Sequence, residues 1–174
     1  MNERPANIET ERLLLVCLLP EEIESLIAGN PKHASLQTGL SFRPDYPSLG
    51  VDWSWHLKAL QADCNQLPWR IRVIAKRASS TVVGSINLKG PPLNGDVEIG
   101  WGLNVDARGK GYATEAAAAV IEWVAQHSTV VSISATVPDD NHPSQRVATR
   151  LGLSRTGEIR RDIPLWRRFL RGLA

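Results

Sequence analysis

The sequence predicts one α+β domain over residues 1–174, with a mixed, mostly antiparallel central sheet and helices on both faces. Three observations indicate this class. Segments with apolar residues at every second position, joined by short turns, predict an antiparallel meander over residues 69–105. A glycine-rich loop and a helix over residues 108–127 follow that meander directly. A further apolar segment at 130–137 makes this stretch a strand-helix-strand crossover, which joins parallel strands.

The first part of the chain predicts one strand, one helix and a long loop. The apolar run 12–19 is a strand that stops at Pro20, which suits the first position of a helix over residues 20–28. Residues 29–50 contain three prolines and predict a loop with at most one helical turn, a natural place for substrate contacts.

The middle of the chain changes from a helical to a strand period. Asp52 is a predicted N-cap, and apolar residues then recur at steps of three and four over 53–64. The segments 69–76 and 81–88 predict a hairpin, and a third strand is expected over 97–105.

After the crossover the sequence predicts one more helix and two closing strands. The helix spans 139–152 with Gly152 just past its end, and the strands span 153–159 and 165–170. The last strand carries several arginines. Such charges either prevent an edge strand from pairing with another chain or face a partner, so we expect a monomer or a homodimer.

Composition narrows the class of protein. A formal net charge of +2 from interspersed charges favours neither nucleic acid nor an anionic membrane as partner. Cys17 and Cys64 predict reduced thiols in the core of an intracellular protein. No apolar run approaches the length of a membrane span, and residues 1–10 do not resemble a targeting signal. We therefore expect a cytoplasmic protein.

The chemistry concentrates in the segment Arg108-Gly109-Lys110-Gly111, which joins a strand to a helix. The free N–H groups at a helix start and the positive end of its dipole bind phosphate. Arg108 and Lys110 add positive charge beside these groups. The segment therefore predicts a phosphate-binding loop, although a glycine turn that only connects two elements has the same spacing.

Two other phosphate-binding classes fit less well. A P-loop needs Lys and then Ser or Thr after its second glycine, where this chain has Tyr112 and Ala113. A dinucleotide fingerprint needs a third glycine or alanine, where Thr114 stands, and an opening position in a parallel sheet. Both patterns fail.

The pattern Arg108-x-x-Gly111-x-Ala113 resembles the signature of the GNAT superfamily of N-acetyltransferases. Residues 112–116 resemble its branch of ribosomal-protein N-terminal acetyltransferases, the RimJ/RimL type. The resemblance is close over residues 82–153 and only general upstream. Other segments that resemble that branch are 10–15, 84–86 and 140–153.

The resemblance implies a GNAT fold whose two parallel strands, 97–105 and 130–137, splay to admit coenzyme A. Acetyl-CoA is then the co-substrate, and no metal is expected. The pantetheine arm would pair with the first strand and the pyrophosphate would lie on the loop amides. The implied cofactor contacts are Leu103, Asn104, Val105, Arg108, Gly109, Lys110, Gly111, Tyr112, Ala113, Thr114, Asn141 and Ser144.

Acetyl transfer needs a deprotonated amine and a proton for the leaving thiolate. Glu98 lies where some GNAT enzymes carry a general base, although a strand glutamate is also a common ion-pair partner. Many relatives protonate the thiolate with a tyrosine, which the predicted helix 139–152 lacks. The resemblance instead places Ser144 near the sulfur and Asn141 near a pantetheine amide. Both are also ordinary helix-start residues.

Other chemistry-bearing residues have two interpretations each. His142 is either a base or a solvated first-turn histidine. Phe42, Trp53 and Trp55 either line an acceptor cleft or belong to the core. His33, His56 and His127 show no spacing typical of a metal site.

The sequence therefore predicts transfer of an acetyl group from acetyl-CoA to a primary amine, by direct attack in a ternary complex. The acceptor is a protein N-terminus or a small-molecule amine, and the sequence does not choose between them. The alternative is a CoA-binding sensor or pseudoenzyme without turnover.

Overall fold

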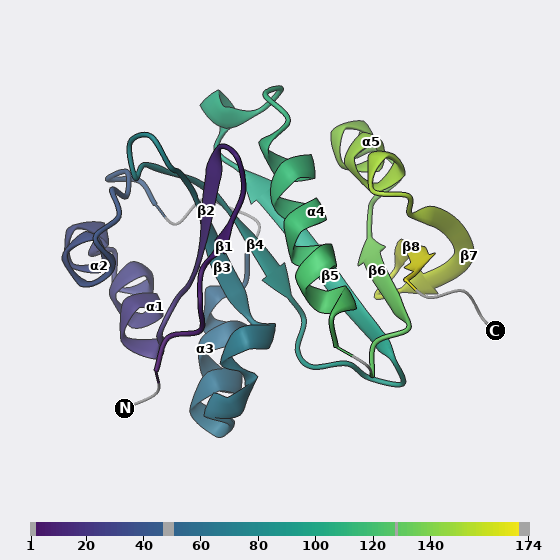
Figure 1. Cartoon of the computed structure of the whole chain (residues 1–174), viewed down its shortest axis with the longest axis horizontal. Helices are drawn as coiled ribbons and strands as arrows, with labels where there is room; N and C mark the ends of the chain where they lie inside the picture. The colour runs from purple at the N-terminus through teal and green to yellow at the C-terminus, as the bar shows by residue number, and fades with distance from the viewer. Residues whose placement is uncertain (1–2, 47–50, 128, 171–174) are drawn as a thin grey trace.

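The computed structural model describes residues 3–46, 51–127 and 129–170, and it has the expected α+β architecture (Figure 1). Within these residues, eight strands form one sheet in the order β1-β2-β3-β4-β5-β6-β8-β7. The strands are β1 (Ile8–Glu9), β2 (Leu13–Cys17), β3 (Ile71–Lys76), β4 (Val82–Leu88), β5 (Asp96–Leu103), β6 (Ser132–Thr136), β7 (Ser154–Arg160) and β8 (Ile163–Phe169). The helices are α1 (Pro20–Ile27), α2 (Pro31–Thr38), α3 (Trp53–Ala62), α4 (Tyr112–Ala125) and α5 (His142–Arg150), with short 3-10 helices η1 (Cys64–Trp69) and η2 (Val105–Ala107).

The sheet opens between its two parallel strands. Neighbouring strands are antiparallel except β5 and β6, whose pairing is limited to Asp96–Glu98 against Ser132–Ser134. Beyond Glu98, β5 continues alongside β4 as far as Leu103. The two parallel strands therefore diverge after three residue pairs (Figure 1).

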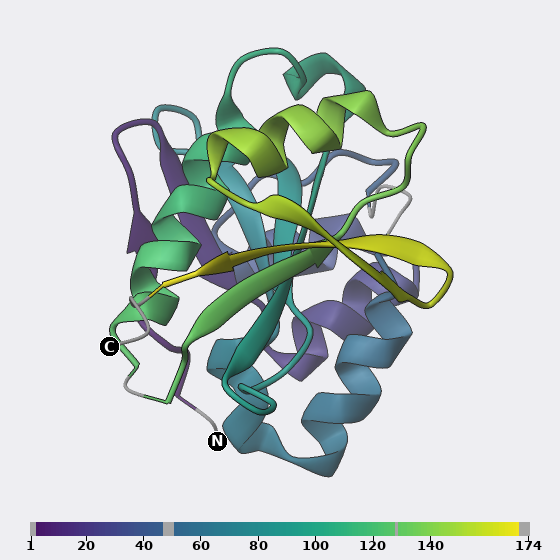
Figure 2. The ribbon, with the colours of Figure 1, turned by 90° about the vertical axis from the view of Figure 1, so that its right-hand side faces the viewer.

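Helices cover both faces of the sheet, as Figure 2 shows with α4 on one side and α1 and α3 on the other. Buried side chains of α4 and α5, among them Ala116, Ala117 and Ala148, join one core cluster with the sheet. The small residues of α4 let its backbone lie close to the strands. The side chains of α1, α2 and α3 form a second cluster with the opposite face.

The helix α2 is a correction to the predicted loop over residues 29–50. Asn30 accepts a hydrogen bond from the His33 amide at 3.1 Å, Pro31 takes the first helical position, and Gly39 ends the helix at φ +73°. These are strong capping signals. The periodicity missed them because only Pro31 and Ala34 are buried in this helix. Residues 47–50 of the predicted loop lie outside the described residues.

The predicted start of α3 is confirmed, but Cys64 is not a core thiol. Asp52 accepts from the Trp55 amide at 2.8 Å, as a capping residue does. The helix ends at Ala62, and Cys64 begins η1 with its side chain exposed. Cys17 is buried, as expected.

Three boundaries near the glycine loop also differ from the prediction. The strand β5 ends at Leu103 and not at Val105, because Val105 starts η2. The helix α4 ends at Ala125, and α5 starts at His142 because Asn141 caps it. Sequence patterns place the ends of elements only to within about two to four residues.

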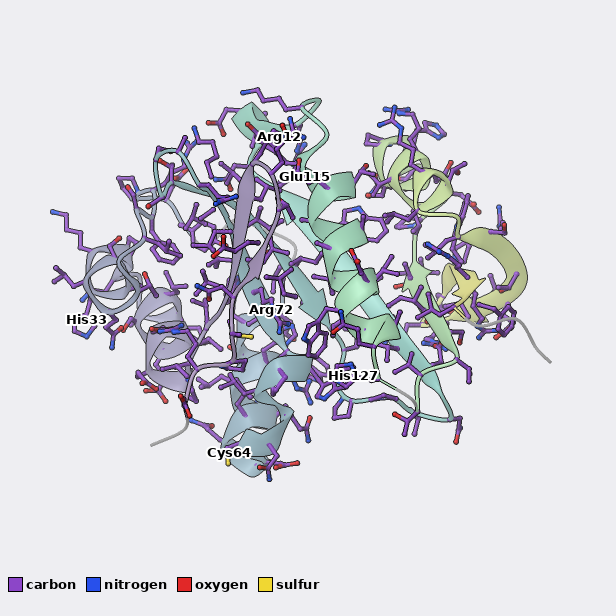
Figure 3. All side chains as sticks on the ribbon, in the orientation of Figure 1. Arg12, His33, Cys64, Arg72, Glu115 and His127 are labelled. Carbon is purple, nitrogen blue, oxygen red and sulfur yellow. The ribbon has the colours of Figure 1, made fainter. Side chains whose placement is uncertain are left out.

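Arg72 lies in the core, although the predicted hairpin placed it among the polar positions of its strand. Because helices cover both faces of β3, the Arg72 side chain is 1% exposed. Its Nη1 donates to the Pro68 carbonyl at 2.8 Å, and its guanidinium lies 4.9 Å from the Trp123 ring centroid. His127, labelled nearby in Figure 3, packs against the Trp123 ring with the two ring centroids 4.5 Å apart and the planes tilted by 55°.

Candidate functional site

A cavity of about 590 Å³ lies where β5 meets the starts of α4 and α5. This volume is within the usual range for small-molecule sites. Residues from β4, β5, the glycine loop and both helices contribute to its walls. The lining residues are Val51, Ser85, Trp101, Gly102, Leu103, Arg108, Gly109, Gly111, Tyr112, Ala113, Thr114, Asn141, Pro143, Ser144, Arg146, Val147 and Arg150.

The glycine loop has the geometry of an anion-binding turn. Gly109 and Gly111 have φ of +75° and +80°, and Gly111 is the N-cap of α4. Only glycine adopts this left-handed conformation without strain. Successive amides around such residues point into one concavity, at the positive end of the helix dipole. The amides of residues 109–114 are therefore suited to a pyrophosphate.

Arg12, in the turn between β1 and β2, holds the glycine loop in place. Its Nε donates to the Glu115 carboxylate at 2.7 Å, and its Nη1 donates to the Lys110 carbonyl at 3.0 Å. Thr10 Oγ1 donates to the same carboxylate at 2.6 Å, and the guanidinium lies over the Tyr112 ring. Figure 3 shows Arg12 and Glu115 together at the start of α4.

Glu115 is ionised by this environment. Burial raises its pKa, but hydrogen bonds from Thr10 and Arg12 more than offset that effect, so the pKa of Glu115 lies below its ordinary value. The network therefore neutralises a carboxylate beside the expected phosphate site.

The two cations of the loop fold back on the preceding turn. Arg108 Nε donates to the Leu103 carbonyl at 3.2 Å, and Lys110 Nζ donates to the Asp106 carbonyl at 2.9 Å. Arg108 lines the cavity, whereas Lys110 is not among the lining residues. The Lys110 side chain therefore stabilises the turn before the loop and does not line the cavity.

The hydrogen bonding of β5 shows which of its backbone groups face the open side. The Asn104 amide donates to the Val83 carbonyl at 2.9 Å, so it points toward β4 and is not available for a cofactor. Because backbone groups alternate along an antiparallel strand, those of Trp101 and Leu103 point away from β4. The pairing expected for Asn104 and Val105 is better made by Trp101 and Leu103. Neither Asn104 nor Val105 lines the cavity.

The start of α5 forms the opposite wall. Asn141 Oδ1 accepts from the Ser144 amide at 3.2 Å, which is the capping role that its position favours. Ser144 itself lines the cavity. Arg146 and Arg150, which the sequence analysis did not single out, also line it. Their spacing of four residues on one predicted helix face was the available signal.

Glu98 lies at the last paired position of β5, is 7% exposed, and does not line the cavity. One carboxylate oxygen accepts from Arg160 at 2.8 Å, and the other accepts from Arg161 and, at 3.2 Å, from Thr136. This is the ion-pair arrangement considered as the alternative to a general base. The pairs tie the β7–β8 hairpin to the centre of the sheet.

The other candidate residues fall into the core or onto the surface. Phe42 and Trp53 are buried in the second core cluster, whereas Trp55 is 40% exposed beneath the Arg70 guanidinium. His142 is exposed and lies 3.5 Å from Gln145 Oε1 through its Nδ1. In the part of the chain that the structure describes, no three His, Cys, Asp or Glu residues gather as a metal site requires.

None of the helices that the structure describes is long and apolar enough to cross a bilayer.

A glycine loop with anion-binding geometry in the wall of a cavity beside β5 is the arrangement expected of an α+β protein that binds a phosphate-containing small molecule. Residues 12–154 match the family profile described as "Acetyltransferase (GNAT) domain". The chain therefore belongs to the GNAT acetyltransferase family.

Individual relatives agree with this assignment. The Bacillus subtilis protein named "Uncharacterized N-acetyltransferase YjdG" is 38% identical over 81 residues, which cover 46% of this chain and 48% of that protein. The alignment thus spans about half the length of that relative.

Solved structures share the fold. A GNAT-family acetyltransferase from Bordetella pertussis superposes with a TM-score of 0.67 at 21% identity, covering 94% of this chain and 99% of that chain. A ribosomal L7/L12 alpha-N-protein acetyltransferase, RimL, in complex with coenzyme A has a TM-score of 0.64 at 18% identity, covering 94% and 98%. At these identities the likeness shows the fold alone.

Proposed function

We propose that this protein transfers an acetyl group from acetyl-CoA to a primary amine by direct attack. The observation that carries the proposal is the left-handed pair Gly109 and Gly111 at the start of α4, opening onto a cavity beside the unpaired edge of β5. A phosphate nest at one end and exposed strand amides at the other match the two polar parts of coenzyme A.

The residues present fit that cofactor. The amides of residues 109–114 would hold the pyrophosphate, and backbone groups of Trp101 and Leu103 would pair with the pantetheine amides. Arg146 and Arg150 lie on the same cavity wall as cations for the remaining phosphate charge. The proposed contacts of Arg108, Tyr112, Ala113, Thr114 and Asn141 are supported by their place in that wall.

The reaction needs little covalent help from the protein. The amine nitrogen forms a bond to the acetyl carbon, the carbon–sulfur bond breaks, one amine proton leaves, and the thiolate takes a proton. We propose that the Ser144 hydroxyl donates a hydrogen bond to the departing sulfur. Its place in the cavity wall and the lack of a tyrosine in α5 support that role.

Glu98 is proposed as the proton acceptor because it sits where β5 and β6 separate. Its ion pairs with Arg160 and Arg161 favour a structural role instead. The variant Glu98→Gln separates these roles: a base predicts that the acid-side limb of the pH–rate profile is lost, whereas a structural glutamate predicts lower stability with an unchanged profile.

Two finer points remain part of the proposal. The RimJ/RimL type, in which the acceptor is a protein N-terminus, is supported by the motifs at residues 112–116 and 140–144. A CoA-binding sensor without turnover is the rival function, favoured by the absence of the usual tyrosine. It predicts binding of acetyl-CoA with no transfer to any amine.

Isothermal titration with acetyl-CoA tests the proposal. The wild-type protein should bind, and Gly111→Leu should abolish binding because the side chain would strain the left-handed turn and approach Arg12 Nη2. Gly29→Leu is the matched control, since Gly29 has φ +70° with no atom within 4 Å of the added carbon and lies outside the cavity. A wild-type protein that gives no heat with acetyl-CoA contradicts the proposal.

A further inference from the structure

The cavity extends to the face of the sheet that α3 covers. Ser85 on β4 and Gly102 on β5 are directly opposite each other, and both line the cavity, as does Val51 just before α3. The other strand partner of Ser85 is Val73 on β3, which is buried in the second core cluster. Residues paired across strands point to the same face of a sheet, so Ser85 faces away from α4. We call the part of the cavity lined by Val51, Ser85 and Gly102 its α3 end.

The α3 end has room for a second ligand. A carbon added at Gly102 would have no atom within 4 Å, so the missing side chain leaves open space opposite Ser85. The glycine loop and the start of α5 line the other end, where the phosphates of coenzyme A are proposed to lie. Direct attack requires the amine and the thioester to meet in one cavity. Because the cofactor takes the end beside α4 and α5, the acceptor is left the α3 end.

Tyr46 contacts Ser85 from the core. The tyrosine is 3% exposed, and its ring packs edge to face against Phe42 and Trp53, with the ring centroids 5.2 Å and 5.8 Å away. Its hydroxyl donates to the Gly84 carbonyl at 3.4 Å. Burial raises the pKa of Tyr46, and a hydrogen bond with Ser85 offsets only part of that rise. The Tyr46 hydroxyl therefore keeps its proton.

The direction of these hydrogen bonds decides what Ser85 can offer a ligand. A hydroxyl group has one proton and two lone pairs. The Tyr46 proton is used on the Gly84 carbonyl, so the Tyr46 oxygen accepts the proton of Ser85. The lone pairs of Ser85 Oγ then remain for a donor in the cavity that Ser85 lines. Ser85 thus suits a ligand that brings an N–H group, whereas Ser144 is proposed to donate its own proton.

We infer that Ser85 Oγ accepts a hydrogen bond from the nitrogen of the acceptor amine, and that Tyr46 is a positioning residue that fixes the direction of the Ser85 hydroxyl. The inference deepens the proposed function and rests on it. It favours primary over secondary amines. A primary amine that loses one proton on acetylation keeps an N–H for Ser85, whereas a secondary amine keeps none.

Two coenzyme A thioethers test this contact without knowledge of the natural acceptor. The amide probe is CoA–S–CH₂–CO–NH–butyl, and the ester probe is CoA–S–CH₂–CO–O–butyl. Both carry the cofactor and an acceptor arm in one molecule, and they differ in the N–H group at the position of the attacking nitrogen. Titration calorimetry gives the dissociation constant of each probe, and their ratio reports the hydrogen bond to Ser85.

The wild-type protein should bind the amide probe about tenfold more tightly than the ester probe. Ser85→Ala should bind the two probes equally. Tyr46→Phe keeps the ring packing and should reduce the preference, because the Ser85 proton can then turn toward the cavity. Ser54→Ala, on the exposed side of α3, is the matched control and should keep the wild-type ratio. Affinity for acetyl-CoA should stay at the wild-type value in all three variants.

Thermal melts establish that each variant folds, and Tyr46→Phe tests the same hydrogen bond if Ser85→Ala does not fold. The inference is wrong if the wild-type protein binds both probes equally, or if Ser85→Ala retains the preference for the amide. It is also wrong if Ser85→Ala loses affinity for acetyl-CoA to the same extent, because Ser85 would then hold the cofactor. An unchanged ratio in Tyr46→Phe removes the positioning role of Tyr46. If the wild-type protein does not bind acetyl-CoA, the proposed function itself fails.

Discussion

Arg12 and Glu115 are 103 positions apart in sequence, yet the Arg12 guanidinium donates to the Glu115 carboxylate at 2.7 Å while a second nitrogen donates to the Lys110 carbonyl. One side chain thus joins the turn between β1 and β2, the glycine loop and the first turn of α4. The glycine loop is thus held by a contact that lies outside the glycine motif itself.

Removing this brace should weaken cofactor binding more than it destabilises the fold. We expect Arg12→Ala to raise the dissociation constant for acetyl-CoA about tenfold, because the Lys110 carbonyl loses a charged donor and the loop loosens. The stability loss should be about 1 kcal/mol or less, since the Arg12 side chain is 45% exposed. Titration calorimetry and urea unfolding measure the two effects. Arg77→Ala is the control, because Arg77 forms a similar exposed pair with Glu9; equal effects of both changes on binding would contradict the role of Arg12.

The same network predicts a pH dependence. The pKa of Glu115 is lower in the folded protein, so its contribution to stability is present above the ordinary carboxyl pKa of about 4.5 and is lost as the pH falls through the folded pKa. We expect the stability difference between wild type and Glu115→Gln to be constant from pH 7 to pH 5 and to shrink below about pH 4.5. Urea unfolding at each pH measures it, and a difference that grows on acidification would show the wrong sign.

His56 should affect stability in a different pH window. Its folded pKa of about 3, caused first by burial and then by Lys89 and Arg70, is below the ordinary value of 6.5. Between those values the unfolded chain binds one more proton, so stability falls as the pH drops below 6.5, by about 1.4 kcal/mol per unit once protonation is complete. His56→Phe should lack this slope between pH 6.5 and pH 5. His33→Phe is the exposed control, and a slope retained in His56→Phe would contradict the assignment.

Replacement by alanine should lower the free energy of unfolding strongly at Gly84 and hardly at all at Gly102. A Cβ at Gly84 would lie 2.2 Å from the Gly102 carbonyl oxygen, so Gly84→Ala must displace β4 from β5 and should cost roughly 2–4 kcal/mol. A Cβ at Gly102 has no atom within 4 Å and points into the cavity side of the strand. Gly102→Ala should therefore keep the unfolding midpoint close to wild type while it reduces turnover. Denaturation and steady-state rates measure the pair, and comparable stability losses would contradict the geometry.

Arg146 and Arg150 should contribute to cofactor affinity through charge. The double change Arg146→Ala and Arg150→Ala should weaken acetyl-CoA binding about tenfold at low salt and less at high salt, because exposed charges are screened. Arg155→Ala, whose guanidinium pairs with Asp139, is the control. Titration at two ionic strengths measures the effect, and an unchanged affinity would remove these residues from the site.

The parts of the site that could be predicted are those marked by residues close together in the sequence, such as a glycine pair or a capping residue. Gly109 and Gly111 are separated only by Lys110 and directly precede α4, so their spacing alone predicts the turn of backbone amides. Asp52 and Pro20 marked helix starts for the same reason. The helix α2 was missed although Asn30 and Gly39 cap it, because its apolar face is too small to show a period.

The sequence by itself determined the α+β class, the crossover and the position of the glycine loop, because each of these has a signal in the local order of residues. Tertiary structure alone decided that Arg12 braces the loop, that Glu98 pairs with Arg160 and Arg161, and that the Asn104 amide is used by β4. It also placed the Asn87 side chain against Gly100. These relationships depend on strand register and on contacts between residues far apart in the chain, and neither is encoded in local spacing.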